Sequence, residues 1–383
     1  MSQAAVSNQL NQSAASVEFS CPICGCAETD RICSAGDVEA HIEYLRRFHR
    51  SRLRHPTDAA LQDRVNFTQE YITNVEACRH CGLVCRTPRP PAGAITHAYS
   101  DDQYGREHLE SEFRLQRAWA ESKVRALRAH LPQSKLRTAL VVEVGSFVGG
   151  FLAAGLEQGW RMIGVDPGKE VTSFCLDQGW NVFCGTLIEA PIQRRTVDAV
   201  AIWNTFDQLP NPDATLSAAR QMLTDQGILV IRVPNGACFR HLIEWHAEAA
   251  APVRSCLMAA MAWNNLLAFP YVYGYTVSTL DQLLARHGFV RWDVEPDTLM
   301  TMTDESSTAW ARFEEKLTKW GCLMAARWEH TRGPRDFQLA PWLDIYYRPA
   351  ESVPDTPLSV PRVPEAVCIP ETAMGGASTR GRS

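Results

Sequence analysis

The chain has 383 residues, of which 45% are hydrophobic and 21% charged, so it can bury one full core and the core of a smaller module. Its net charge of −5 gives no general attraction to polyanions, which argues against nucleic acid as the main partner. The first twenty residues lack a signal-peptide pattern and the sequence holds no run of about twenty apolar residues, so we expect no membrane insertion and a cytoplasmic protein.

Both ends of the chain have the composition of disordered tails. Residues 1–17 are polar and rich in Ala, Ser, Gln and Asn, and residues 350–383 hold repeated prolines before GGASTRGRS. Such segments bury too little apolar surface to offset the entropy lost on ordering. We therefore expect the folded part of the chain to lie between these two tails.

Residues 18–95 form a segment defined by paired cysteines. CPICGC (21–26) and CRHCGLVC (78–85) each contain C-x-x-C followed by glycine. In a cytoplasmic chain such thiols stay reduced or bind metal, and two such pairs complete a tetrahedral Zn²⁺ site. The predicted ligands are Cys21, Cys24, Cys78 and Cys81. Cys26 and Cys85 are rivals whose spacing fits less well, and the alternative is a set of unrelated thiols.

The 53 residues between Cys24 and Cys78 exceed the usual zinc-ribbon spacing of about 15–20 residues, so an insert is expected. Apolar residues at helical spacing predict an amphipathic helix in it: Val38, Ile42, Leu45 and Phe48. On another face stand Arg46, Arg50 and Arg54. This arginine row could hold an anionic substrate or a carrier protein. We favour the alternative, a solvated face balanced by nearby acids.

Residues 96–135 are expected to link this module to the next domain, with a long helix over 108–131. Across 136–349 apolar runs alternate with amphipathic stretches: LVVEV, RMIGV, NVF, DAVAIW and ILVIRV. This alternation predicts βαβ units and a parallel sheet covered by helices on both faces. A mainly helical insert (236–268), another helix, a strand near RWDVE, a helix (306–326) and the strand WLDIYY follow, ending the sheet with an antiparallel edge.

The first of these strands leads into a glycine-rich turn, Gly145-Ser146-Phe147-Val148-Gly149-Gly150. At the carboxyl end of a parallel strand, such a turn lets the backbone approach a ligand closely. A dinucleotide fingerprint has G-x-G-x-x-G and a phosphate loop has G-x-x-x-x-G-K-[ST]. The turn matches neither pattern, so its ligand must be of another kind.

The spacing Glu143-x-Gly145-x-x-x-Gly149 resembles the first motif of class I S-adenosylmethionine-dependent methyltransferases. The resemblance continues at Asp166, 21 residues after Gly145, and through GWNVFCGTLIEA and VDAVAIWNTFDQLPNP, and it covers about 136–348. It implies an α/β fold, a Rossmann-like, doubly wound, seven-stranded methyltransferase sheet, here with a small N-terminal zinc-ribbon module. It also implies S-adenosyl-L-methionine as cofactor, held by Glu143, Gly145, Ser146, Phe147, Gly149, Asp166, Thr186, Leu187 and Trp203.

Within this resemblance the Asp166 carboxylate would accept hydrogen bonds from both ribose hydroxyls, whereas the alternative is a helix N-cap. The residues beside adenine would be Gly185, Thr186 and Leu187. Phe147 departs from the pattern, because the family often has a glycine there. The departure makes the loop bulkier near the methionine end of the cofactor.

The stretch ACRHCGLVCRTPRPPAGAITHAYSDDQY (77–104) resembles the zinc-ribbon leader of a bacterial methyltransferase group that acts on small molecules, including sugar C-methyltransferases. Because four thiolates leave no open coordination position, the resemblance implies a structural or substrate-shaping Zn²⁺. The metal would not activate a water molecule.

Methyl transfer is an in-line displacement, so the protein chiefly aligns the reacting atoms, and a base is needed only when the acceptor must lose a proton. The catalytic candidates are Asn204, Asp207 and Tyr273. Asp207 would be the base, with an N-cap or surface role as the alternative. Gln208 stands where the family often has a histidine, so that position supplies no base.

Three alternating tyrosines in FPYVYGYT would share one face if this segment is extended: Tyr271, Tyr273 and Tyr275. They would line an acceptor pocket, and the alternative is a strand packed by aromatic residues. His241 and His246 are further candidates for the base, with surface histidines as the alternative.

We therefore expect a methyltransferase that modifies oxygen or carbon of a small metabolite, such as a sugar or a natural-product intermediate, whether anionic or carrier-linked. An RNA-modifying methyltransferase is one alternative, and it would require a basic face and steep salt dependence of binding. A non-catalytic cofactor-binding scaffold is another, which Phe147 and the replaced histidine would fit.

Overall fold

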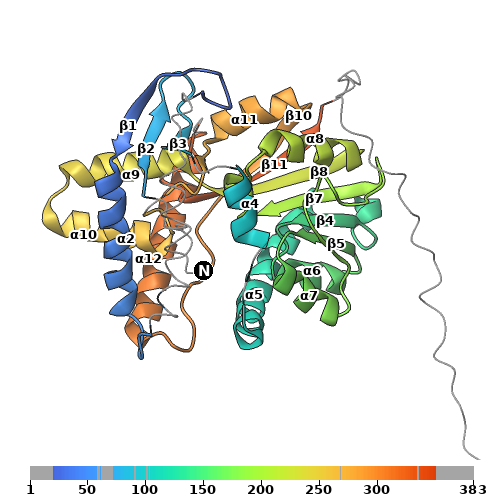
Figure 1. Cartoon of the computed structure of the whole chain (residues 1–383), viewed down its shortest axis with the longest axis horizontal. Coiled ribbons are helices and arrows are strands. Elements are labelled where there is room, and N and C mark those ends of the chain that lie inside the picture. The colour runs from blue at the N-terminus through green and yellow to red at the C-terminus, as the bar shows by residue number, and fades with distance from the viewer. Residues whose placement is uncertain are drawn as a thin grey trace, which may run out of the picture.

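A computed structural model of the chain describes residues 20–57, 61, 72–89, 92–100, 102, 104–267, 269–333 and 336–350. Two lobes lie side by side in Figure 1, one around a seven-stranded sheet and one around a four-stranded sheet with long helices. The predicted tails at 1–17 and 350–383 lie outside the described residues, apart from Ala350. Within the described ranges, none of the helices is long and apolar enough to cross a membrane.

The seven-stranded sheet has the spatial order β6 (Val182–Cys184), β5 (Arg161–Asp166), β4 (Leu140–Val144), β7 (Val197–Trp203), β8 (Leu223–Pro234), β11 (Trp342–Pro349) and β10 (Phe289–Asp297). Strands β4 to β8 pair in parallel, and β11 pairs antiparallel with both of its neighbours. This confirms the predicted α/β fold with a mostly parallel methyltransferase-type sheet.

The predicted antiparallel edge is confirmed, and it consists of two strands, β11 and β10. The last strand, β11, does not form the edge but lies between β8 and β10. The burial of the two strands explains the order, because WLDIYY is buried along its length whereas Val290 and Trp292 of β10 are exposed. A strand that is apolar on both faces stabilises the fold most when helices cover both faces.

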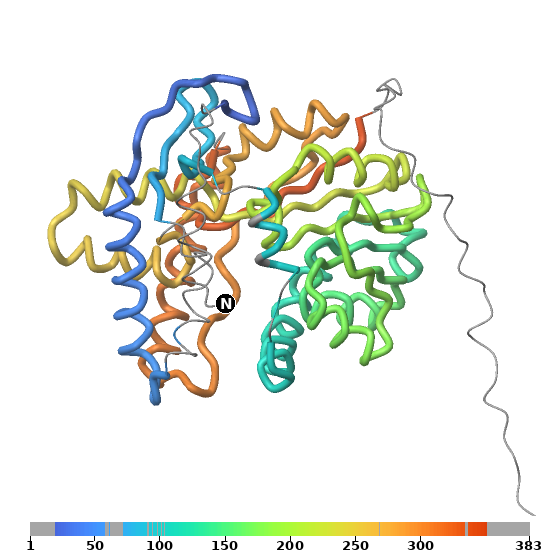
Figure 2. The backbone as a smooth tube through the Cα atoms, in the orientation of Figure 1, coloured from blue at the N-terminus to red at the C-terminus, as the bar shows by residue number. Residues whose placement is uncertain are grey.

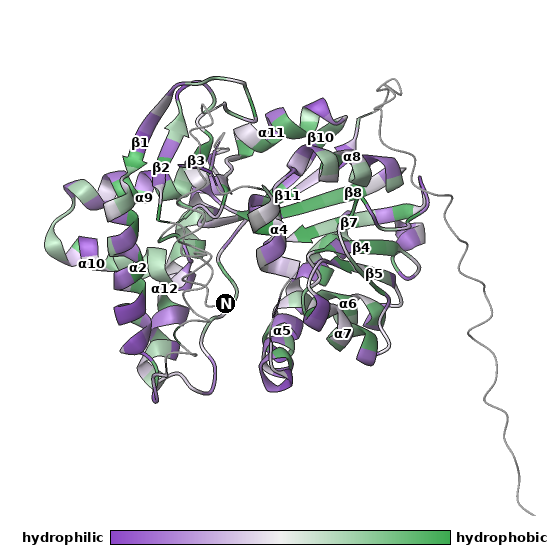
Figure 3. Cartoon of the chain, in the orientation of Figure 1, coloured by the Kyte–Doolittle hydropathy of each residue, from purple (hydrophilic) through white to green (hydrophobic). Residues whose placement is uncertain are grey.

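Helices cover both faces of the sheet. One layer holds α5 (Arg106–His130), α6 (Gly150–Glu157) and α7 (Lys169–Asp177), and the other holds α8 (Pro212–Met222) and α11 (Val277–Arg286) (Figure 2). Alternate side chains of β4 point to different layers: Val141 joins the core beneath α5 and α6, whereas Val142 and Val144 join the core beneath α8 and α11. Both faces of the sheet are therefore apolar, as the strands in Figure 3 show.

The second lobe contains the cysteine segment and the helical insert. Its sheet comprises β1 (Thr29–Cys33), β2 (Asn74–Cys78), β3 (Val84–Thr87) and β9 (Tyr273–Gly274), all antiparallel. The helices are α2 (Ala35–Arg50), α9 (Gly236–Glu248), α10 (Ala251–Trp263) and α12 (Ala309–His330). The predicted apolar face of α2 is confirmed, because Val38, Ile42, Leu45 and Phe48 are buried. One cluster joins them to Phe239 and Trp263 of α9 and α10.

The lobes are joined by strand pairing across a long sequence separation. Strand β9 follows α10, yet it pairs with β3 of the cysteine segment, with Gly274 opposite Val84 and Tyr273 opposite Cys85. A Cβ atom on Gly274 would lie 2.7 Å from the Phe269 ring and 2.9 Å from Val84, so only glycine fits this close approach. Helix α4 (Ala92–Ser100) lies between the lobes (Figure 1).

Candidate functional site

The glycine turn after β4 has the backbone that its sequence predicts. Gly145 and Gly149 have φ angles of 74° and 73°, in the left-handed region that favours glycine. A Cβ atom on Gly145 would lie 2.2 Å from the Thr205 hydroxyl, and one on Gly149 would lie 2.6 Å from the Trp180 ring. Gly145 therefore lets the turn pack against the segment that follows β7, and Gly149 lets it pack against Trp180, which lies between α7 and β6.

Phe147 occupies the position where the resembled family often has glycine. Its φ of 44° lies in the left-handed region, which costs a residue with a Cβ atom of order 1–3 kcal/mol. The backbone is held there because the Phe147 N–H donates to Asp166 (2.8 Å) and the Cys175 thiol donates to the Phe147 carbonyl (3.2 Å). The Phe147 ring makes an edge contact with the ring of Tyr104, 5.7 Å between centroids.

Two buried acids lie at the ends of neighbouring strands. Glu143 is 4% exposed, and burial together with the nearby Asp166 raises the pKa of its carboxyl well above the usual value. Asp166 accepts one backbone hydrogen bond on each oxygen, from Phe147 and from Gly168 (2.9 Å). Burial raises the pKa of Asp166 to about 6. Each Asp166 oxygen retains acceptor capacity, so the carboxylate can take two further donors.

The residues predicted beside adenine lie at the turn after β6. Thr186 is half-buried, and its N–H and hydroxyl both donate to Glu189 at 2.8 and 2.7 Å. Leu187 is buried in the main core. Trp203, at the end of β7, is also buried, with its ring 5.3 Å from Phe151 and 5.8 Å from Trp119.

The turn after β7 holds the predicted base. Asp207 is 1% exposed, and neither of its carboxylate oxygens accepts a hydrogen bond from another described residue. Burial raises the pKa of Asp207 to about 8. The surface and N-cap alternatives are therefore wrong: the carboxylate is buried, and the cap of α8 is Asn211. Asp207 also raises the pKa values of Tyr271 and Tyr275, after the larger effect of their burial.

Orphaned polar atoms gather at this edge of the sheet. Folded proteins pair nearly all their buried polar groups, so a cluster of unpaired ones indicates a place for a ligand. Such atoms occur at the ends of β4 and β7, without a hydrogen-bond partner among the described residues: Glu143 Oε2, Ser146 Oγ, Trp203 Nε1, Asn204 Oδ1 and both Asp207 oxygens. Because the carboxyl ends of parallel strands meet at one edge, these atoms lie along the same edge of the sheet.

Helix α4 supplies a residue that sequence reasoning missed. The Tyr99 hydroxyl donates to the Gln208 side-chain oxygen, and the Gln208 amide donates to the Asn204 carbonyl at 3.0 Å. Gln208 therefore orders the turn that carries Asp207 and ties that turn to α4. The φ of Asn204 is 53°, a left-handed conformation that asparagine tolerates.

The tyrosine segment is extended only in part. Strand β9 comprises Tyr273 and Gly274, and the Tyr273 and Tyr275 rings lie 5.7 Å apart on one side, with Tyr275 also 5.3 Å from Phe206. Arg89 donates to the Tyr273 hydroxyl at 3.1 Å. Tyr275 is fully buried and its hydroxyl has no hydrogen-bond partner in the described chain. Asp207 contributes to the raised pKa of Tyr275, after burial and Tyr273, whereas the groups that act on Tyr273 include Arg89 and Asp213.

His241 and His246 lie on α9, in the second lobe. His241 is 6.0 Å from Trp245 between ring centroids, and His246 lies near enough to His41 of α2 to lower its pKa slightly, after the larger effect of burial. Neither makes a contact with the β4 and β7 turns in the described structure. The surface interpretation fits both histidines better than a catalytic one.

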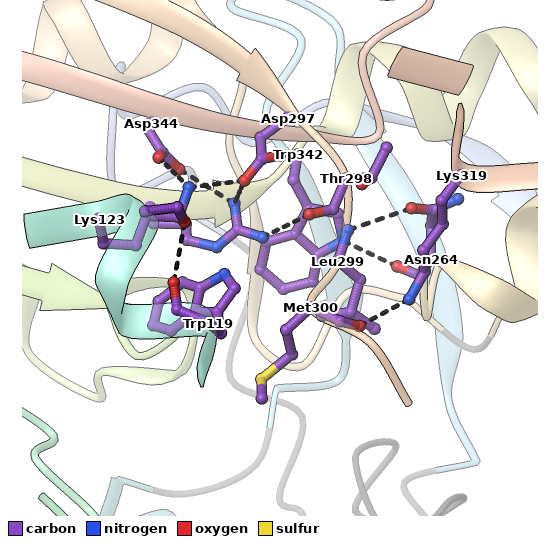
Figure 4. Close-up of polar contacts among 12 residues, drawn as sticks. Trp119, Lys123, Asn264, Asp297, Thr298, Leu299, Met300, Lys319, Trp342 and Asp344 are labelled. Atoms are coloured by element: carbon purple, nitrogen blue, oxygen red, sulfur yellow. Dashed lines mark hydrogen bonds and ion pairs between the residues drawn. The ribbon is translucent and has the colours of Figure 1, made fainter. Parts of the chain in front are cut away.

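A buried ionic cluster supports the site from the side of β8. Arg232 is fully buried and donates to Asp344 at 3.0 Å, and Asp297 accepts from Arg232 and from Lys123 at 3.0 and 2.6 Å (Figure 4). Lys123 of α5 also donates to Asp344. Two cations thus face two carboxylates. The sequence gives no signal for the cluster, because Lys123 and Asp344 are 221 residues apart.

The four predicted cysteines come together in the second lobe. Cys21 and Cys81 lie 3.5 Å apart between sulfurs, as do Cys24 and Cys78, and all four sulfurs are within 4.8 Å of one another. Tetrahedral zinc with Zn–S bonds of about 2.3 Å needs sulfurs roughly 3.8 Å apart. The cluster therefore has the size and donors that zinc requires.

The two knuckles are built alike. Gly25 and Gly82 have φ angles of 73° and 78°, and each donates its N–H to the first cysteine of its pair, Cys21 and Cys78, at 2.8 and 2.9 Å. The two alternative ligands, Cys26 and Cys85, make other contacts: the Cys26 thiol donates to the Glu28 carbonyl, and the Cys85 thiol donates to the Glu76 carbonyl.

The strand order and the turn between β4 and α6 define a class I methyltransferase architecture. Residues 114–294 match the family model described as a methyltransferase domain. This segment of the chain is thus a class I methyltransferase domain. A search of curated proteins found no match.

Similar solved structures include a SAM-dependent methyltransferase from Archaeoglobus fulgidus, with 19% identity, 62% of this chain and 97% of that chain covered, and a TM-score of 0.40. A possible histamine N-methyltransferase from Thermotoga maritima has 16% identity, coverage of 62% and 93%, and a TM-score of 0.39. The plantazolicin methyltransferase BamL, in complex with an analog and SAH, has 16% identity, coverage of 67% and 94%, and a TM-score of 0.39.

Proposed function

We propose that the protein transfers the methyl group of S-adenosyl-L-methionine to an oxygen or carbon atom of a small molecule. The observation that carries the proposal is the set of orphaned buried polar atoms at the ends of β4 and β7, beside the glycine turn of a methyltransferase domain. A site that leaves Glu143, Asn204 and Asp207 unpaired is built for a polar ligand with several donors.

The predicted cofactor residues keep the roles proposed from the sequence. Asp166 would accept the ribose hydroxyls on the lone pairs that its backbone donors leave free, while Glu143, Gly145, Ser146, Phe147 and Gly149 form the turn around the methionine part. Thr186, Leu187 and Trp203 would border the adenosyl group. The cofactor supplies a methyl group on a sulfonium, which is already activated for displacement.

Asp207 is our candidate for the base. A general base works best when its pKa lies near the working pH, and burial raises the pKa of Asp207 to about 8. Above that pH the carboxylate can take a proton from an acceptor hydroxyl or an acidic C–H. Asn204 and Tyr273 stay in the proposal as groups that orient the acceptor, and Tyr275 joins them as a buried unpaired hydroxyl.

We also propose that Cys21, Cys24, Cys78 and Cys81 bind one structural Zn²⁺. Its role would be to fix the β1–β2–β3 sheet, and with it β9 and the tyrosines of the acceptor side. Because β3 pairs with β9, the metal would shape the acceptor site without touching the reacting atoms.

Whether the acceptor is anionic or carrier-linked remains a prediction. Arg46 and Arg50 are exposed, which favours the interpretation of this side of α2 as a solvated face.

The experiment that tests the function uses methyl-labelled S-adenosyl-L-methionine. The purified protein is incubated with the cofactor, a small-molecule extract and cellular RNA, and labelled small molecules are separated from labelled RNA. We expect label in small molecules, and loss of that label in Asp207→Asn but not in the half-buried control Asp213→Asn, whose carboxylate pairs with His287. Label found only in RNA would instead favour the RNA-modifying alternative. Cofactor binding without label in either fraction would favour the scaffold.

A further inference from the structure

Helix α12 carries its apolar residues on the outside. Six large side chains between Trp310 and Trp328 are 44–62% exposed: Trp310, Phe313, Leu317, Trp320, Met324 and Trp328. Soluble helices normally turn such residues toward the core and expose polar ones. Three exposed tryptophans on one 22-residue helix are the reverse of that pattern. This feature lies outside the methyltransferase site.

The opposite face of α12, which packs on the protein, buries two small and two charged residues: Ala311, Ala326, Glu315 and Lys319. Glu315 is 1% exposed and accepts the N–H groups of Met302 and Thr303 at 2.6 and 3.0 Å. Lys319 donates to the Met300 carbonyl at 2.6 Å (Figure 4). It also forms an ion pair with Glu315. Arg52, which follows the end of α2, binds Glu314 with two hydrogen bonds, of 2.6 and 2.7 Å. These specific bonds fix which face of α12 is turned inward, so a simple rotation of the helix cannot bury its tryptophans.

The spacing of the exposed residues is that of a helix-pairing seam. Positions 310, 313, 317, 320 and 324 alternate steps of three and four, which is the a/d pattern of two helices packed side by side. The next position in this series is Arg327, which is exposed. A partner that matches the seam is therefore itself a helix with apolar residues at the same steps.

We propose that α12 is a dimerisation helix that packs antiparallel against α12 of a second copy of this chain. In a two-fold antiparallel pair centred between residues 318 and 319, Leu317 faces Trp320 of the other copy, and Phe313 faces Met324. Trp310 then faces Arg327, a cation–π pair at each end. Gly321 has open space where a side chain would stand, so it leaves room beside Trp320 for the Leu317 side chain of the second copy.

The area of this face fits a dimer interface. Aromatic side chains bury about 150–250 Å² each, so the six half-exposed residues offer on the order of 600–800 Å² per copy. A standard interface buries about 800 Å² per partner. The α12 seam alone thus comes close to the area that a specific dimer needs.

The charges around the seam favour a protein partner over a lipid surface. A helix that lies on a membrane carries its cations on a free polar face, whereas on α12 the polar face is bonded to the protein through Glu315 and Lys319. The whole chain also has a net charge of −5, which disfavours an anionic bilayer. We therefore take a second copy as the occupant and use vesicle binding as a contrary outcome.

Sedimentation equilibrium of the full chain tests the proposal. We expect a dimer for the wild type and a monomer for Trp320→Glu, with the far-UV circular dichroism spectrum unchanged. The matched control is Trp245→Glu, since Trp245 is a 45%-exposed tryptophan on α9, and this variant should remain dimeric. A wild-type monomer at every concentration would overturn the proposal, as would a Trp320→Glu dimer. A wild-type monomer that instead sediments with anionic vesicles would assign the face to lipid.

Cysteine crosslinking tests the antiparallel register without weakening the seam broadly. Phe313→Cys combined with Met324→Cys should give a disulfide-linked dimer on mild oxidation, because the two positions face each other across the pair. Within one helix they are about 16 Å apart, too far to bridge. Phe313→Cys alone should crosslink no more than the wild type. If the single variant crosslinks as well as the double variant, the helices run parallel and the proposed register is wrong.

Discussion

At the scale of the residue, the site is defined by groups that folding leaves unsatisfied. Asp207 is buried, has no partner for its carboxylate in the described chain and lies beside the unpaired Asn204 oxygen. Such an arrangement costs stability, because an ionised carboxylate without partners is unfavourable away from water. Proteins retain such a destabilising residue where a ligand or a reaction needs it.

Because burying the Asp207 carboxylate destabilises the fold, we predict that Asp207→Asn stabilises the protein in a pH-dependent way. The unfolded carboxyl ionises near pH 3.9 and the folded one near pH 8, so between these values the unfolded state binds fewer protons and the free energy of unfolding falls as pH rises. Asparagine does not ionise, so the free energy of unfolding of the variant does not fall with pH for this reason. We expect the variant to be more stable than the wild type by about 1–3 kcal/mol at pH 8 and nearly equal at pH 4 in urea unfolding. If Asp207→Asn were instead less stable than the wild type by the same amount at pH 4 and pH 8, Asp207 would be ionised and hydrogen-bonded in the folded protein.

At the scale of the element, the helices and strands that could be predicted are those that a short stretch of sequence encodes. The apolar runs predicted β4, β5, β7 and β8, and the helical spacing of Val38, Ile42, Leu45 and Phe48 predicted α2. The two C-x-x-C-G knuckles predicted the cysteine cluster, because each pair is set by a local turn. The sequence could not predict β9, since a two-residue strand has no periodicity and its partner β3 is about 190 residues away.

The two cysteine knuckles lead us to predict that bound zinc stabilises the β1–β2–β3 sheet. Cys78→Ser should lower the zinc content from about one ion per chain and destabilise this sheet, since a structural zinc site contributes directly to folding. Elemental analysis and thermal melting measure both effects. Cys26→Ser is the matched control, because the Cys26 thiol bonds only its own turn, and its zinc content should equal that of the wild type. A wild-type protein without zinc would contradict the metal assignment.

The buried ionic cluster is an element-scale feature that sequence reasoning missed, because it joins α5, β8, β10 and β11 through charges far apart in the chain. Removing one partner from such a cluster leaves its counter-charges buried and unpaired. Asp344→Ala should therefore lower the free energy of unfolding by about 3–5 kcal/mol, measured in urea. The exposed control Asp293→Ala on β10 should change it little. A loss below about 1 kcal/mol in Asp344→Ala would show that water replaces the carboxylate.

At the scale of the whole molecule, the proposed site draws its residues from both lobes. The seven-stranded lobe supplies the glycine turn, Asp166 and Asp207, while the second lobe supplies the tyrosine strand through its pairing with β3. Long-range contacts tie the lobes together, including the hydrogen bond that Arg286 of α11 donates to the Pro22 carbonyl of the cysteine segment, which spans 264 residues. The class of the fold could be predicted from the order of its local motifs. The way the lobes interlock could not, because it rests on contacts that no short stretch of sequence contains.

The central claim is that the edge of β4 and β5 binds S-adenosyl-L-methionine through Asp166, and titration calorimetry of the full chain tests it most directly. We expect the wild type to bind the cofactor and Asp166→Ala to bind it at least ten-fold more weakly, since charge-assisted hydrogen bonds contribute about 1.5–3 kcal/mol. The exposed control Asp177→Ala should bind like the wild type, and circular dichroism should show that Asp166→Ala stays folded although its turn loses two backbone hydrogen bonds. No binding by the wild type, or equal affinity for Asp166→Ala and the wild type, would contradict the account.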